Sequence, residues 1–146
     1  MICIVSSCGG HLTEIRSLLK ILQKYSHFYV INDIIDLPMD MKNNTYFIKH
    51  SERDLKFFIN LIEALVILKK TKPKIIISAG AGPAVPLTLI GKILYKSEII
   101  FIESITRVNK PSLTGRILYF YADHFFYQWK ELKNYYKKGI YVGTII

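Results

Sequence analysis

The chain has 146 residues, of which 51% are apolar, and its 20 Lys and Arg against 11 Asp and Glu give a formal net charge of +9. This composition excludes most disordered, collagen-like and two-domain proteins, and a chain of this length buries roughly 68–70% of the surface that its unfolded form exposes. We therefore expect one domain over residues 1–146, with a core that needs no metal or disulfide. The positive charge favours an anionic partner, which could be nucleic acid, a phosphorylated substrate or the cytoplasmic face of a membrane.

The first expected strand, residues 2–6, follows Met1 without a basic leader or a small-residue cleavage site, so we expect no signal peptide. Cys3 lies in this strand and Cys8 in the turn after it, where a disulfide would have to fold the strand back on itself. Two free thiols indicate a reducing compartment, and we expect the chain to be cytoplasmic.

A turn of small residues follows this strand, and it is made of Ser6, Ser7, Cys8, Gly9, Gly10 and His11. Small side chains let backbone N–H groups approach an anion, and the N-terminal end of the next helix attracts the same charge. An imidazole at that position can act as a base or donate to a phosphate. A tight strand-to-helix turn that uses glycine only for its dihedral angles explains the same residues, and this alternative stays open.

The next segment predicts an amphipathic helix over about residues 12–22. Its apolar face consists of Leu12, Ile15, Leu18, Leu19 and Leu22, and its polar face of Glu14, Arg16, Ser17 and Lys20. This pattern is typical of a crossover helix with its polar face, Glu14 included, in solvent.

A second helix, about residues 51–70, follows the strands expected at residues 28–32 and 46–49. Between residues 55 and 68 its only polar side chains are Lys56, Asn60 and Glu63, whose spacing predicts a thin wet stripe on an otherwise apolar cylinder. The segment is too short and too interrupted to span a bilayer, so we expect no transmembrane helix. We prefer a helix packed between its neighbours to one that presents a membrane-binding or partner-binding face.

The strand expected at residues 74–78 leads into a second glycine-rich loop, which ends at Pro83, the expected start of a third helix. Gly80 and Gly82 have the spacing of the first two glycines of G-x-G-x-x-G, but Val85 takes the place of the third. The loop also follows the fourth strand rather than the first. The dinucleotide-binding motif is therefore not met, and a P-loop motif does not occur either.

The strand expected at residues 98–102 is followed by Glu103, and Arg107 comes four residues later. Catalytic groups gather at the carboxyl ends of parallel strands, which makes Glu103 a candidate base. A solvated ion pair between Glu103 and Arg107 is the alternative.

Seven of the eleven residues from 119 to 129 are aromatic, and two more strands are expected at residues 125–127 and 140–142. Four apolar residues before and within this cluster share one face of an expected helix and are expected in the core: Leu113, Ile117, Phe120 and Tyr121. The remaining aromatic residues, near Arg116, Lys130 and Lys133, could form a partner surface or rest at a lipid interface. No nucleic-acid-binding motif accompanies them, so we do not expect a nucleic acid as partner.

The seven expected strands alternate with helix-length segments, which indicates an α/β fold with a mainly parallel sheet and helices on both faces. Residues 74–78 and 99–102 are apolar without alternation, as in strands buried on both faces, so we place them near the centre of the sheet. In this fold class, ligands bind where loops leave the carboxyl ends of the strands.

Several motifs together resemble one family along nearly the whole chain. They are residues 6–13 (SSCGGHLT), 78–86 (SAGAGPAVP), 102–104 (IES), Arg107, 113–115 (LTG), 128–129 (QW) and 141–143 (YVG). The family is that of asparagine-linked glycosylation protein fourteen, the acceptor-side subunit of a split sugar transferase, and the chain looks closest to the bacterial PssD branch of capsule and exopolysaccharide synthesis. The resemblance implies the Rossmann-like N-terminal half of a GT-B glycosyltransferase. Eukaryotic members carry an N-terminal membrane anchor, which we expect this chain to lack.

The resemblance also implies a reaction. A separate donor-binding glycosyltransferase subunit would hold a UDP-sugar, and an inverting transfer without metal or cofactor would add galactose or N-acetylglucosamine in β-1,4 linkage to a polyprenyl-pyrophosphate-linked sugar acceptor. His11 is the first candidate for contact with the acceptor phosphate or for the catalytic base, and Glu103 is the second candidate for the base. The residues expected to bind the acceptor or its phosphates are Ser6, Ser7, Gly9, Gly10, Gly80, Gly82 and Arg107. The chain would work as a peripheral protein on the inner, cytoplasmic face of the cell membrane.

Two other functions stay open. The chain could be a non-catalytic scaffold that recruits and stabilises the true transferase at the membrane through residues 55–68 and 119–129. A stand-alone nucleotide-binding oxidoreductase with Asp33 as its ribose-binding acid is the weaker possibility, and the incomplete glycine motif argues against it.

Overall fold

A computed structural model of the chain describes residues 1–7, 10–32, 41–49, 56–80 and 82–145, except for the side chains at positions 19, 42, 56 and 57. Several residues used above lie outside this described part: Cys8, Gly9, Asp33, Ala81 and the expected start of the second helix at Ser51.

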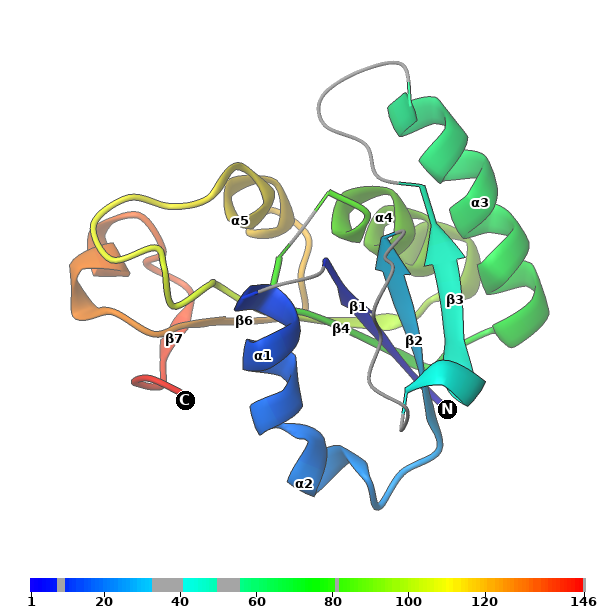
Figure 1. The fold of residues 1–146 in the computed structure, drawn as a ribbon. Helices are drawn as coiled ribbons and strands as arrows, with labels where there is room; N and C mark the ends of the chain where they lie inside the picture. Colours follow the sequence, from blue (N-terminus) through cyan, green and yellow to red (C-terminus); the bar gives the residue numbers. More distant parts are fainter. Residues whose placement is uncertain (8–9, 33–40, 50–55, 81, 146) are drawn as a thin grey trace.

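Seven parallel strands form one sheet in the order β3-β2-β1-β4-β5-β6-β7 (Figure 1). Their bounds are β1 Ile2–Ser6, β2 His27–Asn32, β3 Thr45–Ile48, β4 Ile75–Ser78, β5 Glu98–Ile102, β6 His124–Tyr127 and β7 Ile140–Tyr141. Ile4 of β1 pairs with Tyr29 of β2 on one side and with Ile77 of β4 on the other. The predicted parallel α/β fold is confirmed, as is the central position of β4 and β5.

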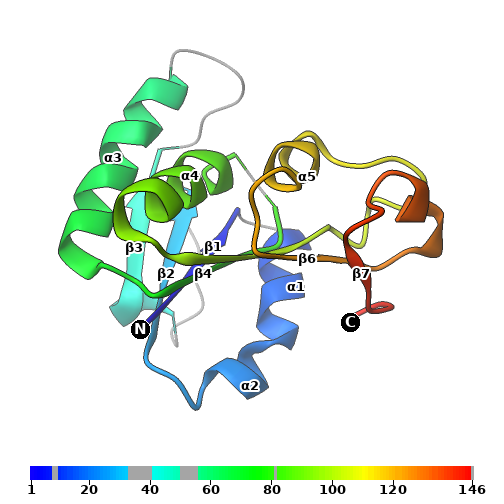
Figure 2. The same cartoon turned by 180° about the vertical axis from the view of Figure 1, so that it is seen from behind.

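Helices cover both faces of the sheet. Their bounds are α1 Gly10–Ser17, α2 Leu19–Leu22, α3 Lys56–Thr71, α4 Ala84–Tyr95 and α5 Leu113–Leu118, with short 3-10 helices η1 at Lys42–Asn44 and η2 at Lys130–Asn134. Figures 1 and 2 show α1 and α2 on one side of the sheet and α3, α4 and α5 on the other. None of the described helices is both long enough and apolar enough to cross a membrane.

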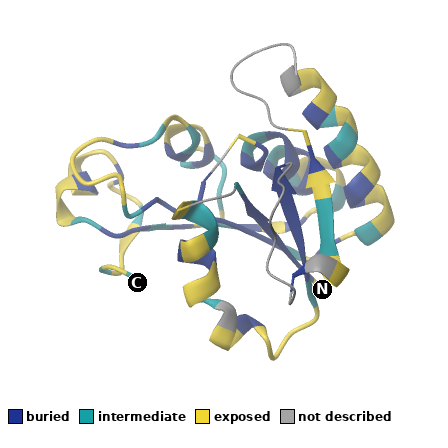
Figure 3. Ribbon diagram, viewed as in Figure 1, coloured by how far each residue is buried: buried dark blue, intermediate teal, exposed yellow. Residues whose placement is uncertain are grey.

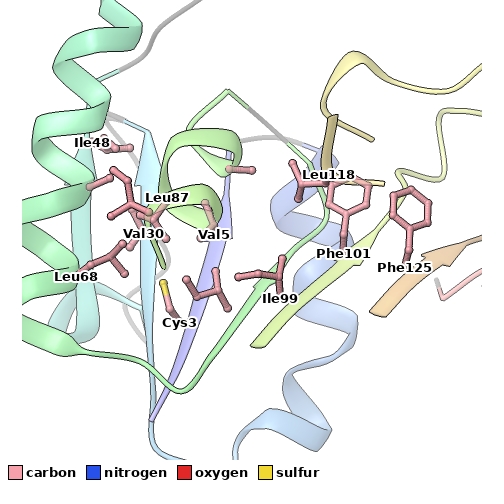
Figure 4. Packing of buried hydrophobic residues seen from close by; sticks show 14 of the residues in the cluster. Cys3, Val5, Val30, Ile48, Leu68, Leu87, Ile99, Phe101, Leu118 and Phe125 are labelled. Carbon is pink, nitrogen blue, oxygen red and sulfur yellow. The ribbon is translucent and has the colours of Figure 1, made fainter. Parts of the chain in front are cut away.

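The larger hydrophobic core lies between the sheet and helices α3 to α5 (Figure 4). Cys3 and Val30 of the sheet meet Leu68 of α3, while Leu118 of α5 lies near Phe101. Burial raises the pKa of the Cys3 thiol well above its usual range, and Cys3 is a free cysteine as expected. A thiol held in its neutral form in this position is a small hydrophobic side chain of the core.

The first predicted helix is divided in two. The Ser17 hydroxyl donates to the Glu14 carbonyl at 2.6 Å, and the Leu18 N–H bonds to the Ile15 carbonyl three residues back at 3.0 Å. Such hydroxyl-to-backbone bonds bend helices, and α1 ends here before α2 begins. The expectation that Glu14 faces solvent is wrong, because Glu14 is only 1% exposed.

Helix α3 is oriented against expectation. Two of the three residues of its predicted wet stripe face inward: Asn60 is buried with Ala64 and Leu68, and Glu63 accepts a hydrogen bond from the Lys49 backbone N–H at 3.0 Å. The side chain of the third, Lys56, lies outside the described part. The outward stripe is apolar instead, with Phe58, Ile62 and Val66 exposed by 63–65%. Figure 3 shows exposed positions recurring along α3. The expectation of a helix packed between its neighbours is therefore wrong for the outer side of α3.

The predicted apolar face of residues 113–121 also differs. Helix α5 ends at Leu118, and the side chain that it buries in the core is Leu118. Leu113 and Ile117 point to solvent, and Phe120, which follows the helix, is 87% exposed. These three residues are therefore surface residues, and the prediction that they belong to the core is wrong, whereas Tyr121 packs against the core as expected.

Candidate functional site

The candidate site lies where the sheet order changes direction. The chain runs from β1 outward to β2 and β3, then returns to place β4 on the other side of β1 and continues to β5. In open parallel sheets, such a point leaves a crevice outside the carboxyl ends of the strands, and ligands bind in it. The loops after β1, β4 and β5 meet at this point.

His11 connects the first two of these loops. Its ring lies against Gly80 in the loop after β4, so that a Cβ atom built on Gly80 would stand 3.1 Å from His11 Cε1 and 3.4 Å from Nδ1. Gly80 also has a φ of +110°, and its N–H donates to Ser78 Oγ at 3.1 Å. Glycine is therefore needed here both for its backbone conformation and for the space that the imidazole fills.

Glu14 connects the third loop to the same place. One carboxylate oxygen, Oε1, accepts hydrogen bonds from Ser104 Oγ at 3.1 Å and from the Ile105 backbone N–H at 2.5 Å. The other oxygen, Oε2, lies 3.6 Å from His11 Nδ1. Sequence reasoning missed Glu14 because its position fits the polar face of α1. The signal that could have found it is its place three residues after His11, on the same side of a helix.

Glu103 follows β5, as expected, and its carboxylate is buried. Oε1 accepts from the Ser104 N–H and Oε2 from the Ser112 N–H, each at 3.1 Å, and the Tyr136 hydroxyl donates to Oε2 as well. These three donors hold the carboxylate in the interior. The alternative of a solvated ion pair with Arg107 is wrong, and the role of Glu103 as a base stays a prediction.

Gly115 explains how the Glu103 carboxylate fits beneath α5. A Cβ atom at Gly115 would collide with the Glu103 carboxylate and with the Tyr136 hydroxyl. The first turn of α5 is also capped from inside the same loop, since Ser112 Oγ accepts the Gly115 N–H at 2.8 Å. The glycine of the LTG motif is therefore explained by the space that the buried carboxylate needs.

The Gln128 and Trp129 side chains support the loop after β5 from the side of β6. Gln128 Nε2 donates to the Glu103 carbonyl at 3.0 Å, and Trp129 Nε1 donates to the Ile105 carbonyl at 2.6 Å. The backbone of this loop is thus bound on two sides, by the two side chains that follow β6 and by Glu14 of α1.

The remaining residues of the first turn are close to His11 along the chain. The Ser6 side chain is buried, and its hydroxyl donates to the Ser7 carbonyl at 2.8 Å. Gly10 begins α1 at the surface, and no atom of the other described residues, apart from the backbone of its own helix, lies within 4 Å of the position that its Cβ would take. Gly9 is outside the described residues.

Gly82 and Arg107 are exposed on the second and third loops. The Arg107 backbone N–H donates to the Ser104 carbonyl at 2.9 Å, which closes a turn after β5. The structure thus brings His11 and Gly80 into contact, and it ties Glu103 to them only indirectly, through Ser104 and Glu14.

The chemistry available at this point is that of an imidazole backed by a carboxylate. His11 is 32% exposed, and its Nδ1 atom is buried, so the exposed part of the side chain belongs to its other atoms. Such an imidazole can accept a proton from a substrate hydroxyl. Among the described residues, no group of three or more His, Cys, Asp or Glu side chains is placed to hold a metal ion.

Comparison with known sequences gives one consistent family. The family described as "Oligosaccharide biosynthesis protein Alg14 like" matches residues 54–145. The human UDP-N-acetylglucosamine transferase subunit ALG14 is 30% identical over 179 aligned positions, which cover 99% of this chain and 82% of that protein. The Saccharomyces cerevisiae subunit of the same name is 41% identical over 61 residues, covering 41% of this chain and 26% of that protein.

Two solved structures show the same fold. MurG from Acinetobacter baumannii superimposes with a TM-score of 0.70 at 16% identity, over 89% of this chain and 42% of that one. UDP-GlcNAc 2-epimerase from Methanocaldococcus jannaschii superimposes with a TM-score of 0.66 at 15% identity, over 94% of this chain and 42% of that one. This chain therefore corresponds to less than half of either structure.

Proposed function

We propose a function that starts from the family: this chain belongs to the Alg14-like family of oligosaccharide biosynthesis proteins, and we infer that it is one subunit of a two-chain glycosyltransferase. The relatives are named transferase subunits, which supports a catalytic partner. The fold shared with MurG accounts for 42% of the MurG chain, which supports a second, donor-binding chain on the other side of the crevice.

The donor that we propose is a UDP-sugar held by the partner. Of the two candidate sugars, we prefer N-acetylglucosamine to galactose. The names of the relatives support N-acetylglucosamine. The acceptor that we propose is a polyprenyl-pyrophosphate-linked sugar of capsule or exopolysaccharide synthesis, extended in β-1,4 linkage, and the PssD branch is part of this proposal. The pyrophosphate would lie near the turn at Gly9 and Gly10, with Ser6, Ser7, Gly82 and Arg107 as further candidate contacts.

The reaction that we propose uses His11 as the base. As the acceptor hydroxyl gives its proton to His11, its oxygen bonds to the anomeric carbon of the donor. The bond from that carbon to UDP breaks with inversion, and UDP leaves with the electron pair. The observation that carries this proposal is the partly exposed His11 imidazole, which lies between Gly80 and Glu14 where the loops after the strands meet. Glu103 is the second candidate, and its three hydrogen-bond donors make His11 the better one.

The location that we propose for this chain is the cytoplasmic face of the cell membrane, where it would bind as a peripheral protein. The apolar outer stripe of α3, which consists of Phe58, Ile62 and Val66, supports this proposal together with the exposed Lys69 and Lys70 at the end of the helix. Apolar side chains beside lysines bind anionic lipid surfaces through both burial and charge.

The test is transfer by the chain reconstituted with a donor-binding partner. We expect His11→Asn to lower turnover by about 10²-fold or more, the usual contribution of a general base. UDP-N-acetylglucosamine and UDP-galactose are compared as donors, with a short polyprenyl-pyrophosphate sugar as acceptor. The matched control is His124→Asn, since His124 lies exposed on β6 in a pair with Glu98. Unchanged turnover in His11→Asn would remove His11 from the mechanism.

The scaffold function is the alternative, and the exposed apolar side chains of α3 and of Leu113, Ile117 and Phe120 favour it. A scaffold would bind the partner and leave the acceptor to it. Acceptor binding by this chain without its partner, lost in His11→Asn, supports the transferase subunit, whereas co-purification with the partner and no acceptor binding supports the scaffold.

A further inference from the structure

Glu14 is a buried carboxylate with only one of its two oxygens satisfied. Its Oε1 accepts two hydrogen bonds, from Ser104 Oγ and the Ile105 N–H. Its Oε2 is buried and accepts none from the described residues. Buried carboxylates are nearly always paired, because an unpaired one loses its hydration without compensation. The free oxygen of Glu14 therefore needs a partner.

The group that faces this oxygen is His11 Nδ1, which is also buried and also without a hydrogen-bond partner among the described residues. The two atoms are 3.6 Å apart, which is within ion-pair range and longer than a hydrogen bond. Each unsatisfied atom costs stability, and a hydrogen bond between the two atoms would satisfy both at once. This happens only if Nδ1 carries the proton, since the carboxylate has none to give.

We propose that Glu14 is the positioning residue of His11: it holds the imidazole in the tautomer with the proton on Nδ1 and so leaves the Nε2 lone pair free for the acceptor hydroxyl. This inference rests on the proposed function for its effect on turnover, but the tautomer itself is a property of this chain alone. The tautomer of a histidine is set by the hydrogen bond that its other nitrogen makes.

The surroundings of Glu14 keep its carboxylate in place for this role. Ser104 Oγ contacts Thr106 Oγ1 at 3.1 Å, and the Ile105 carbonyl accepts the bond from Trp129 Nε1. The loop after β5 thus fixes Oε1, and with it the direction of Oε2 toward His11. In this arrangement the orientation of His11 depends on the loop that also carries Arg107.

The alternative is that Glu14 only clamps the loop after β5 and has no effect on the ring of His11. Glu14→Gln separates the two roles. Its amide oxygen can still accept from Ser104 and Ile105, whereas its NH₂ group would point at Nδ1 and donate to it, which favours the opposite tautomer. Ser104→Ala is the matched control, since it removes one bond to Oε1 and leaves the negative charge facing His11.

The first measurement is the nitrogen NMR spectrum of the full chain labelled at histidine, recorded at alkaline pH with the His11 signals assigned by His11→Asn. We expect the Nδ1–H tautomer in the wild type and in Ser104→Ala, and a shift to the Nε2–H tautomer in Glu14→Gln. The same tautomer in the wild type and in Glu14→Gln would overturn the proposal.

The second measurement is the turnover of the reconstituted pair. We expect Glu14→Gln to lower kcat by about 10²-fold with little change in KM, because the base is misoriented while the acceptor still binds. If Glu14→Gln changes the tautomer but not kcat while His11→Asn is inactive, the positioning role in catalysis is wrong. If His11→Asn is fully active, the proposed base is wrong instead, so the two failures are distinguishable.

Discussion

Gly80 leaves the space in which the His11 ring lies. Any other residue would place a Cβ atom 3.1 Å from His11 Cε1, which is tighter than ordinary van der Waals contact, and would have to adopt a φ of +110°. L-residues with a side chain rarely adopt this conformation, and it costs roughly 1–3 kcal/mol where it is enforced. The glycine therefore belongs to the site and not only to the turn.

We expect Gly80→Ala to lower the free energy of unfolding by roughly 1–3 kcal/mol and to reduce turnover of the reconstituted pair, because both the backbone and the imidazole must shift. Urea unfolding and transfer assays measure the two effects. Gly10→Ala is the stability control, since its Cβ position meets none of the other described side chains within 4 Å. If Gly80→Ala is as stable as Gly10→Ala, the packing argument for His11 fails.

His11 and Glu14 differ in how far their roles can be predicted from the sequence. The position of His11 after a glycine-rich turn was enough to select it as a candidate. The sequence pattern predicts that its neighbour Glu14 faces solvent, because a carboxylate between polar positions of an amphipathic helix is normally exposed. Its two donors come from residues 104 and 105, some 90 positions along the chain, and only the fold brings them to α1.

At the scale of elements, α3 shows the largest difference from expectation. Its polar residues Asn60 and Glu63 face the protein, and its outer stripe is apolar. The sequence pattern shows that the helix has one polar stripe and a wide apolar surface, but not which side meets the sheet. Exposed apolar patches commonly mark contacts with a partner or a lipid surface, and the stripe on α3 therefore supports the membrane contact proposed above.

We expect the double variant Ile62→Gln and Val66→Gln to bind vesicles of anionic phospholipid about tenfold more weakly than the wild type, because two apolar side chains no longer enter the lipid. Stability should change by no more than about 0.5 kcal/mol, since both residues are exposed. Cosedimentation with vesicles measures binding, and thermal unfolding measures stability.

The control for the vesicle experiment is Ile21→Gln. Ile21 is 63% exposed, like Ile62, but it lies on α2, on the opposite side of the sheet. Equal weakening by this variant would mean that binding does not depend on α3.

At the scale of the whole molecule, Tyr136 ties the C-terminal part of the chain to the site. Its buried hydroxyl donates to Glu103, 33 residues earlier, beneath α5. Burial raises the pKa of Tyr136, and the hydrogen bond to Glu103 and the charge of that carboxylate raise it further. In the unfolded chain a tyrosine titrates near pH 10, so above that pH the unfolded state loses a proton that the folded state keeps.

We expect this difference to appear as a loss of stability at alkaline pH. The contribution of Tyr136 is complete below about pH 10 and is lost as the pH rises toward its folded-state pKa. Above about pH 10, the free energy of unfolding should therefore fall by up to about 1.4 kcal/mol per pH unit more in the wild type than in Tyr136→Phe. Urea unfolding at about pH 9 and about pH 11 measures the slopes, and parallel slopes would contradict the prediction.

The comparison of the wild type with Tyr136→Phe also cancels the effect of Cys3 on the pH dependence of stability. Burial raises the pKa of the Cys3 thiol, so above about pH 9 the thiol loses its proton in the unfolded chain and keeps it in the folded one. The free energy of unfolding therefore falls with rising pH, and it does so equally in both proteins. The difference between the two slopes therefore reports Tyr136 alone.

The sequence by itself determined the seven strands, their parallel arrangement and the loops that carry the candidate site, because these follow from local apolar runs and from glycine, whose effects act within a few residues. It also placed His11 at the edge of the sheet. The tertiary structure alone decided that Glu14 faces His11, that Glu103 is held in the interior by Ser112 and Tyr136, and that the apolar stripe of α3 faces outward. Each of these depends on contacts between segments far apart in the chain, and helical periodicity does not specify which face meets which neighbour.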